Sequence, residues 1–161
     1  MNSHRLIMLA ASAVTLAACN PFHHEPAVQV STGDVNVNSR WHATLTTPAE
    51  LAGAVQMTGS ASMAPGSTSG NTLVSVSIAN ATPGGVHPWA VHRGQCGADD
   101  GVFGPSDAYQ PIKVGSNGRA SASATLPIAS PTTGEYFVSV RASATNPETV
   151  VACGNLAPPT R

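Results

Sequence analysis

Hydrophobic and polar residues alternate along three stretches of the chain. In residues 73–78 (LVSVSI), Val74, Val76 and Ile78 fall on one side and serines on the other. Residues 120–126 (ASASATL) and 136–141 (YFVSVR) show the same alternation. Because successive side chains of a strand point to opposite faces, each stretch predicts a half-buried β-strand.

Glycine and proline cluster between these stretches. The clusters lie at residues 64–70, 82–85, 115–118 and 130–134, where they predict turns. No convincing amphipathic helix is apparent from residue 19 onward. We therefore expect one all-β domain, an antiparallel sandwich or flattened barrel of about 115 residues that begins near Trp41.

The composition agrees with an all-β fold. Aromatic residues make up 4% of the chain and charged residues 9%, whereas small and β-branched residues dominate. Such a composition suits short strands joined by tight turns. Residues 20–40 are polar, contain prolines and the pair His23-His24, and predict a tether that buries little surface. A mobile histidine pair is poorly preorganised for metal, so a solvated linker is the favoured interpretation.

The N-terminus has the pattern of an export signal. Arg5 precedes an apolar run, residues 6–18, that is too short for a permanent membrane span. Residues 16–19 (LAAC) resemble the bacterial lipobox, in which the cysteine receives a diacylglyceryl group before cleavage on its amino side. The alternative is an ordinary secreted protein in which Cys19 merely lies near the cleavage site. The expected division is a signal peptide (1–18), a lipidated N-terminus and tether (19–40) and a folded domain (41–161).

The net charge of the mature chain indicates which partners to expect, and the residue after Cys19 indicates the membrane of attachment. Loss of Arg5 with the signal leaves six Lys and Arg against eight Asp and Glu, which argues against nucleic-acid binding. The expected membrane partner is reached through the lipid anchor, and no protein partner is identified. Asn20 follows Cys19 where aspartate would signal retention in enteric bacteria. By that resemblance, we expect attachment to the outer membrane, facing the periplasm.

Cysteine counting then predicts a disulfide. With Cys19 assigned to lipid, Cys96 and Cys153 are the two that remain, in a compartment that is oxidising if export is correct. We expect them to form one bridge. The alternative is a pair of free thiols that act as metal ligands.

Three segments together resemble one enzyme family. Residues 84–97 (GGVHPWAVHRGQCG) carry two histidines and a cysteine, residues 134–141 (GEYFVSVR) form the later strand, and residues 152–156 (ACGNL) hold the last cysteine. In this order the segments resemble the copper/zinc superoxide dismutases, especially their small bacterial lipoprotein relatives. The resemblance covers roughly residues 41–156. It implies an eight-stranded Greek-key β-sandwich or barrel, and also implies the bridge already inferred.

The same resemblance predicts a degenerate metal site. Alternate strand residues face one way, so the family's His-x-His pair presents two imidazoles to copper. Here Ala90 replaces the first and only His92 remains, while Arg141 stands at a further copper-histidine position. A protonated guanidinium has no lone pair to donate. Instead, the fixed charge of Arg141 would take the electrostatic place of the lost cation, disfavour protonation of His92 and repel copper.

Zinc is disfavoured on similar grounds. No histidine follows His92, and Asp99, Asp100 and Asp107 alone do not provide the nitrogen or sulfur that zinc prefers. The remaining donors are compatible with copper, through a rearranged site built from His87 and His92 with help from His42. Residues five apart on a strand point to opposite faces unless a bulge or Pro88 turns the chain.

Other candidates have structural interpretations. Met57 and Met63 could form a cuprous thioether site but are typical of gap-filling core, and Trp89 is expected to pack against the sandwich. No Ser-His-Asp or Cys-His arrangement is apparent, so nucleophilic catalysis has no candidate. Three functions remain open: a non-catalytic binding or structural envelope protein, a copper-dependent superoxide dismutase, and a low-affinity copper-binding protein.

Overall fold

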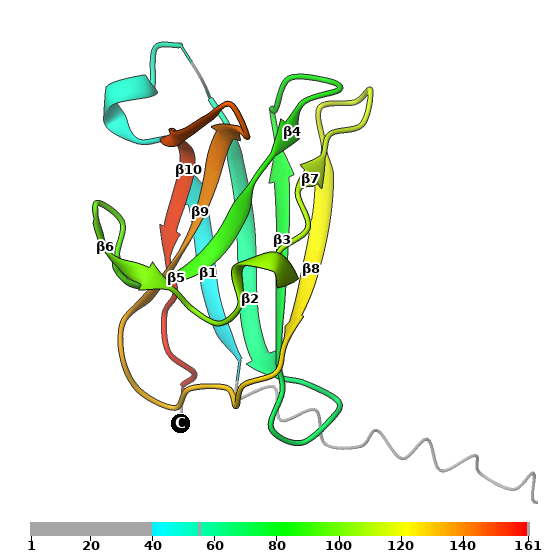
Figure 1. Cartoon of the computed structure of the whole chain (residues 1–161). Coiled ribbons are helices and arrows are strands. Elements are labelled where there is room, and N and C mark those ends of the chain that lie inside the picture. Colours follow the sequence, from blue (N-terminus) through cyan, green and yellow to red (C-terminus); the bar gives the residue numbers. More distant parts are fainter. Residues whose placement is uncertain (1–39, 55, 161) are drawn as a thin grey trace, which may run out of the picture. The chain divides into compact units, whose positions relative to one another are not determined.

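The computed structural model describes residues 40–54 and 56–160, so the predicted signal peptide, Cys19 and nearly all of the tether lie outside the described residues. Strands are the main secondary structure of the described part (Figure 1). They are β1 (Trp41–Thr46), β2 (Thr58–Pro65), β3 (Thr72–Ala79), β4 (Val86–His87), β5 (Trp89–Gln95), β6 (Ala98–Val102), β7 (Ile112–Lys113), β8 (Ala120–Leu126), β9 (Tyr136–Ser143) and β10 (Asn146–Asn155).

Helical structure in residues 40–54 and 56–160 is limited to two 3₁₀ turns, η2 (Ala49–Leu51) and η3 (Ser106–Ala108). Neither turn has the length or the hydrophobicity needed to span a bilayer. The three strands predicted from alternation are confirmed as β3, β8 and the first part of β9. The prediction that each is half-buried is wrong for β9, because residues 137–140 are buried on both faces of the sheet.

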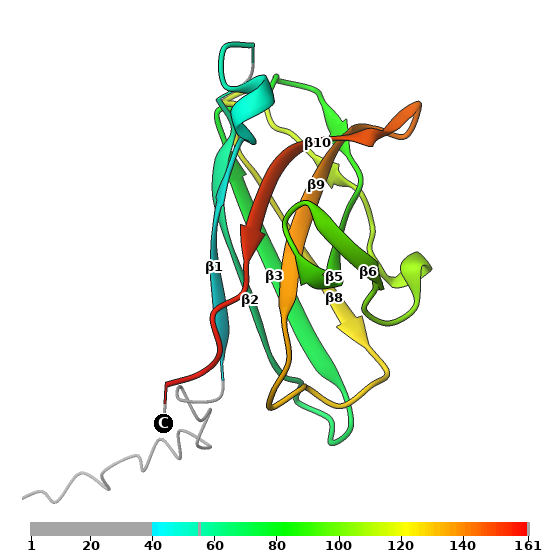
Figure 2. The same ribbon diagram turned by 90° about the vertical axis from the view of Figure 1, so that its left-hand side faces the viewer.

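Eight of the strands form one antiparallel sheet in the order β6-β5-β9-β10-β1-β2-β3-β8. This sheet curls into a half-barrel, and β4 and β7 form a separate two-stranded ribbon (Figures 1 and 2). The turn predicted at residues 64–70 begins later than expected, because Ala64 and Pro65 still pair with Leu73 and Thr72 of β3. Pro65 is tolerated because it is the last residue of its strand.

The inner face of the half-barrel carries the hydrophobic core. As the alternation predicted, Val74, Val76 and Ile78 are buried there. Trp89, Met57 and Met63 are also part of the core, which confirms that they are packing residues. Trp89 meets the ring of Tyr109 edge to face, with 5.2 Å between centroids.

The β1–β10 junction closes tightly because of one glycine. A Cβ on Gly154 would overlap the carbonyl oxygen of Thr44, so a larger residue would push the two strands apart. The junction is short: Thr46 lies opposite Cys153, and an isolated bridge joins His42 to Ala157. Beyond Thr46 the chain leaves β10 and turns into η2.

Candidate functional site

The candidate site lies on the outer face of the sheet, on β5. Trp89 and Val91 point into the core, so the alternate residues Ala90 and His92 point outward. His92 is nevertheless only 2% exposed. A second layer therefore covers the outer face of β5 at this position.

Part of that layer is β6, which folds back on β5. Gly94 and Gly97 have positive φ angles of 93° and 88°, which glycine adopts without a steric penalty. A Cβ on Gly94 would also overlap the carbonyl oxygen of Ala98. The tight return brings Asp99 to His92, where the carboxylate accepts a hydrogen bond from Nδ1 at 2.9 Å. The same carboxylate accepts a hydrogen bond from the amide of Gly101 at 2.7 Å.

The other ring nitrogen of His92 is bound from β9. Ser139 Oγ lies 3.0 Å from Nε2, and Ser139 is fully buried. Because Asp99 takes the proton on Nδ1, Nε2 of the neutral ring accepts the hydroxyl proton of Ser139. Phe137, opposite His92 in the β5–β9 ladder, stacks on the imidazole with centroids 5.0 Å apart. Both nitrogens and one face of His92 are thus occupied by protein groups.

Arg141 completes the polar cluster. Its Nη2 lies 3.6 Å from Asp99 Oδ2, and its Nη1 donates a hydrogen bond to the Pro147 carbonyl at 2.7 Å. The predicted positive charge near His92 is present, although it contacts the imidazole's partner rather than the imidazole. Burial is the main cause that lowers the pKa of His92, and Arg141 adds to it, while Asp99 opposes it.

His87 lies apart from this cluster. It is 8% exposed, and its Nδ1 donates a hydrogen bond to the backbone carbonyl of Arg141 at 2.9 Å. Its Nε2 is buried and has no partner among the described residues. His42 is exposed on the outer face of β1. The three histidines considered for a rearranged copper site are therefore not brought together.

The donors present do not fit the copper or zinc of the resembling family. Across residues 40–54 and 56–160, no three His, Cys, Asp or Glu side chains lie close enough to hold one metal ion. Ala90 offers no donor atom, and the lone pair on Nε2 of His92 is used by Ser139. No catalytic step through a metal is therefore derived.

No Ser-His-Asp arrangement was apparent from the sequence, but in the fold Asp99, His92 and Ser139 form a hydrogen-bonded chain in that order. This order matches the triad of serine hydrolases. However, Ser139 is 0% exposed and lies in mid-strand between β5 and β10, where no substrate carbonyl reaches its Oγ. The chain of hydrogen bonds satisfies a buried polar group and does not form a nucleophile.

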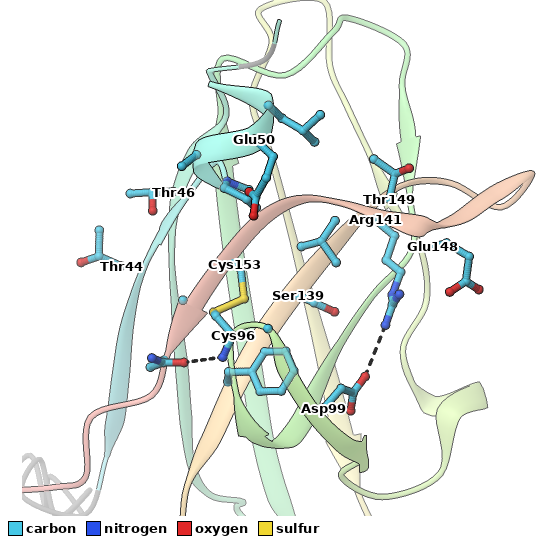
Figure 3. Close-up of a pocket in the computed structure, with 18 residues that line it drawn as sticks. Thr44, Thr46, Glu50, Cys96, Asp99, Ser139, Arg141, Glu148, Thr149 and Cys153 are labelled. Atoms are coloured by element: carbon cyan, nitrogen blue, oxygen red, sulfur yellow. Dashed lines mark hydrogen bonds and ion pairs between the residues drawn. A yellow bond between two sulfur atoms is a disulfide. The ribbon is translucent and has the colours of Figure 1, made fainter. Parts of the chain in front are cut away.

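A groove of about 890 Å³ opens beside the cluster (Figure 3). Its floor includes Arg141 and the predicted Cys96–Cys153 disulfide, which is confirmed, and Ser139 lies below this floor with no exposed surface. The bridge ties the loop before β6 to β10, and Asn155 Oδ1 accepts a hydrogen bond from the Cys96 amide at 2.8 Å. The disulfide thus helps to hold the layer that covers His92.

No protein-family model and no curated protein sequence matches this chain.

The sequence did not predict that Asp99 and Ser139 would contact His92. Asp99 was considered only as a zinc ligand, and Ser139 only as an alternating strand residue. The signal for Asp99 was its position after Gly97 and before Gly101, in a turn short enough to fold back on His92. Ser139 carried no comparable signal, because only strand pairing brings it to the imidazole.

Proposed function

We propose that this protein is a cell-envelope lipoprotein whose folded domain keeps a copper/zinc superoxide dismutase-like scaffold and serves a non-catalytic binding or structural role. The observation that carries the proposal is the environment of His92. Asp99 and Ser139 occupy the two ring nitrogens, so the one histidine left from the expected His-x-His pair has no free lone pair for copper.

The arrangement of strands supports the scaffold. The chain passes from β3, near one end of the large sheet, to β5, near the other. It returns from β6 to β8 through β7, and crosses again from β8 to β9. Such long crossovers between antiparallel strands are typical of Greek-key β-proteins. The bridge between the segment after His92 and the last strand also agrees with the resemblance.

The charges around His92 support the proposal that this site no longer binds copper. The guanidinium of Arg141 stands beside Asp99, so the carboxylate on His92 is already neutralised by a fixed cation. Copper binding would require displacement of Ser139 from Nε2 and would place a metal cation near this charge. Both changes weaken any site built on His92.

The anchor rests on the sequence alone. The residues LAAC at 16–19 support lipidation of Cys19, and Asn20 supports the outer membrane, facing the periplasm. The acyl chains would hold the protein at the membrane, and residues 20–40 would separate the folded domain from it.

Metal content of the purified full-length protein tests the non-catalytic role. After loading with copper or zinc and exhaustive dialysis, we expect far less than one metal ion per chain and no dismutase activity. One retained copper per chain with activity would instead support the copper-dependent dismutase. Retained copper without activity would support the copper-binding protein.

A restored-ligand variant tests the scaffold. Ala90→His combined with Arg141→His returns two imidazoles to the expected copper positions, and we expect copper affinity to rise by orders of magnitude. The matched control is Ser123→His with Thr145→His, which adds one imidazole on β8 and one in the turn between β9 and β10, so that the two are not placed on one metal ion. Equal copper affinity in the two variants would contradict the degenerate-site interpretation.

A further inference from the structure

The groove forms where β1 and β10 stop pairing and diverge. β1 ends at Thr46, opposite Cys153, whereas β10 extends back to Asn146. Among the described strands, none pairs with residues 147–152 of β10 on the side opposite β9. Figures 1 and 2 both show the upper part of β10 diverging from β1 toward a projecting hairpin. One side of β10 is therefore an open strand edge.

η2 forms the opposite wall of the groove. Pro48, Ala49 and Glu50 line it there, and Glu148, Thr149 and Val150 line it on β10. An exposed strand edge in a soluble protein is normally covered or blocked, because its unpaired amides and carbonyls can pair with another chain. Here the edge is recessed in a groove and left accessible between two walls.

The groove is acidic. Figure 3 shows Glu50 and Glu148 on opposite sides, with Ser139 and the disulfide between them. Neither glutamate forms an ion pair within residues 40–54 and 56–160. The guanidinium of Arg141, the one cation that lines the groove, is held by Asp99 and the Pro147 carbonyl. Two carboxylates are thus available to a ligand.

We propose that this groove binds an extended peptide segment with basic side chains, which adds as a strand to the open edge of β10. Main-chain hydrogen bonds to residues 148–150, the part of the open edge that lines the groove, would supply affinity, and ion pairs with Glu50 and Glu148 would supply selectivity for lysine or arginine. The inference deepens the proposed binding role and rests on it, because it names the class of partner that a non-catalytic domain would take.

The experiment compares three probes on the purified full-length protein. The first is a peptide of about eight residues that alternates valine and lysine, the second replaces lysine by glutamate, and the third is the lysine peptide with N-methylated amides along one edge. We expect the lysine peptide to bind with a Kd in the micromolar range and the glutamate peptide about tenfold or more weaker. The N-methylated peptide should also bind at least about tenfold more weakly than the unmodified lysine peptide, because it lacks the amide donors for strand addition.

Variants of the groove provide the matched controls. Glu50→Gln with Glu148→Gln should weaken binding of the lysine peptide several-fold. The control is Asp107→Asn with Asp100→Asn, which changes two acidic residues that do not line the groove and should leave the affinity unchanged. The inference is overturned if the lysine peptide does not bind, if the glutamate peptide binds equally well, or if methylation of its backbone has no effect.

The metal measurement separates this inference from the proposed function. A protein that lacks copper and fails to bind the lysine peptide overturns the inference alone. A protein that retains copper and dismutates superoxide overturns the proposed function, whatever the peptide does.

Discussion

His92 shows how a buried imidazole is accommodated without a metal. Burial penalises an unpaired ring nitrogen, so each nitrogen needs a partner. Asp99 accepts from Nδ1, and Ser139 donates to Nε2. Arg141 in turn balances Asp99. Both ring nitrogens of His92 are therefore satisfied within the protein, which supports the proposed non-catalytic role.

Removal of the Ser139 hydroxyl tests this description. In Ser139→Ala, Nε2 of His92 stays buried and loses its partner, so the free energy of unfolding should fall by about 1–3 kcal/mol. Guanidinium denaturation measures the change. Ser123→Ala, at an exposed position of β8, is the control and should be nearly neutral. A Ser139 variant as stable as the control would mean that the hydrogen bond contributes nothing.

The pH dependence of stability follows from the lowered pKa of His92, caused first by burial. An unfolded histidine takes up its proton near pH 6.5, whereas the folded one does so at lower pH. The unfolded state therefore binds more protons just below pH 6.5, and the free energy of unfolding should fall there as the pH decreases.

Denaturation between about pH 7 and pH 5 measures this loss. His92→Gln should reduce the slope, and His42→Gln, at an exposed position, should not. Burial alone would raise the pKa of Asp99, but the Gly101 amide, His92 and Arg141 together hold it below its ordinary value. Stability from Asp99 is therefore lost only in more acidic solution, below about pH 4. Equal slopes in both histidine variants would rule out His92 as the titrating group.

At the scale of elements, the β5–β6 return and the disulfide form one covering layer. β6 carries Asp99 to His92, and the bridge fastens the loop before β6 to β10. Phe137, Ser139 and His92 are buried on the outer face of the sheet because of this layer. The hydrophobic core lies on the other face, so the sheet is covered on both sides here.

Reduction of the Cys96–Cys153 bridge should destabilise the fold strongly. The two cysteines are 57 residues apart in the sequence, and closing a loop of that length stabilises a fold by roughly 4 kcal/mol in the chain-entropy model. Guanidinium denaturation with and without a dithiol reductant measures the difference. The double variant Cys96→Ser with Cys153→Ser should have a low free energy of unfolding without reductant, and reductant should not lower it further. An unchanged midpoint after verified reduction would exclude this role.

At the scale of the whole molecule, the predicted anchor and the folded domain are separable. The described domain has a core of its own on the concave face of the half-barrel, and none of its helices could cross a membrane. Attachment through a lipid on Cys19 stays a prediction from the sequence.

Cys19→Ser tests the anchor. The variant lacks the thiol that would receive the diacylglyceryl group, so we expect no lipid, no cleavage before residue 19 and no retention in the detergent phase. Metabolic labelling with a fatty acid and mass spectrometry of the N-terminus measure both steps. Cys96→Ser is the control and should be lipidated normally. A Cys19 variant that is still processed and held by the membrane would contradict the lipobox assignment.

The sequence by itself determined three of the strands, part of the core and the disulfide. A two-residue period is a local signal, so Val74, Val76 and Ile78 could be assigned to a buried face before any partner was known. The bridge followed from counting cysteines, a constraint that needs no coordinates. Ala90 and Arg141 were singled out only through the resemblance to copper/zinc superoxide dismutases, so their assignment to former ligand positions stays a prediction.

Only the tertiary structure decided what surrounds His92 and where the groove lies. Ser139 is 47 residues away in the sequence and reaches the imidazole through the pairing of β5 with β9. The open edge of β10 depends on where β1 ends and η2 turns away, which no single segment encodes. Local patterns fix which way a side chain points. Its partners depend on strand order and register, which form only when distant segments pack together.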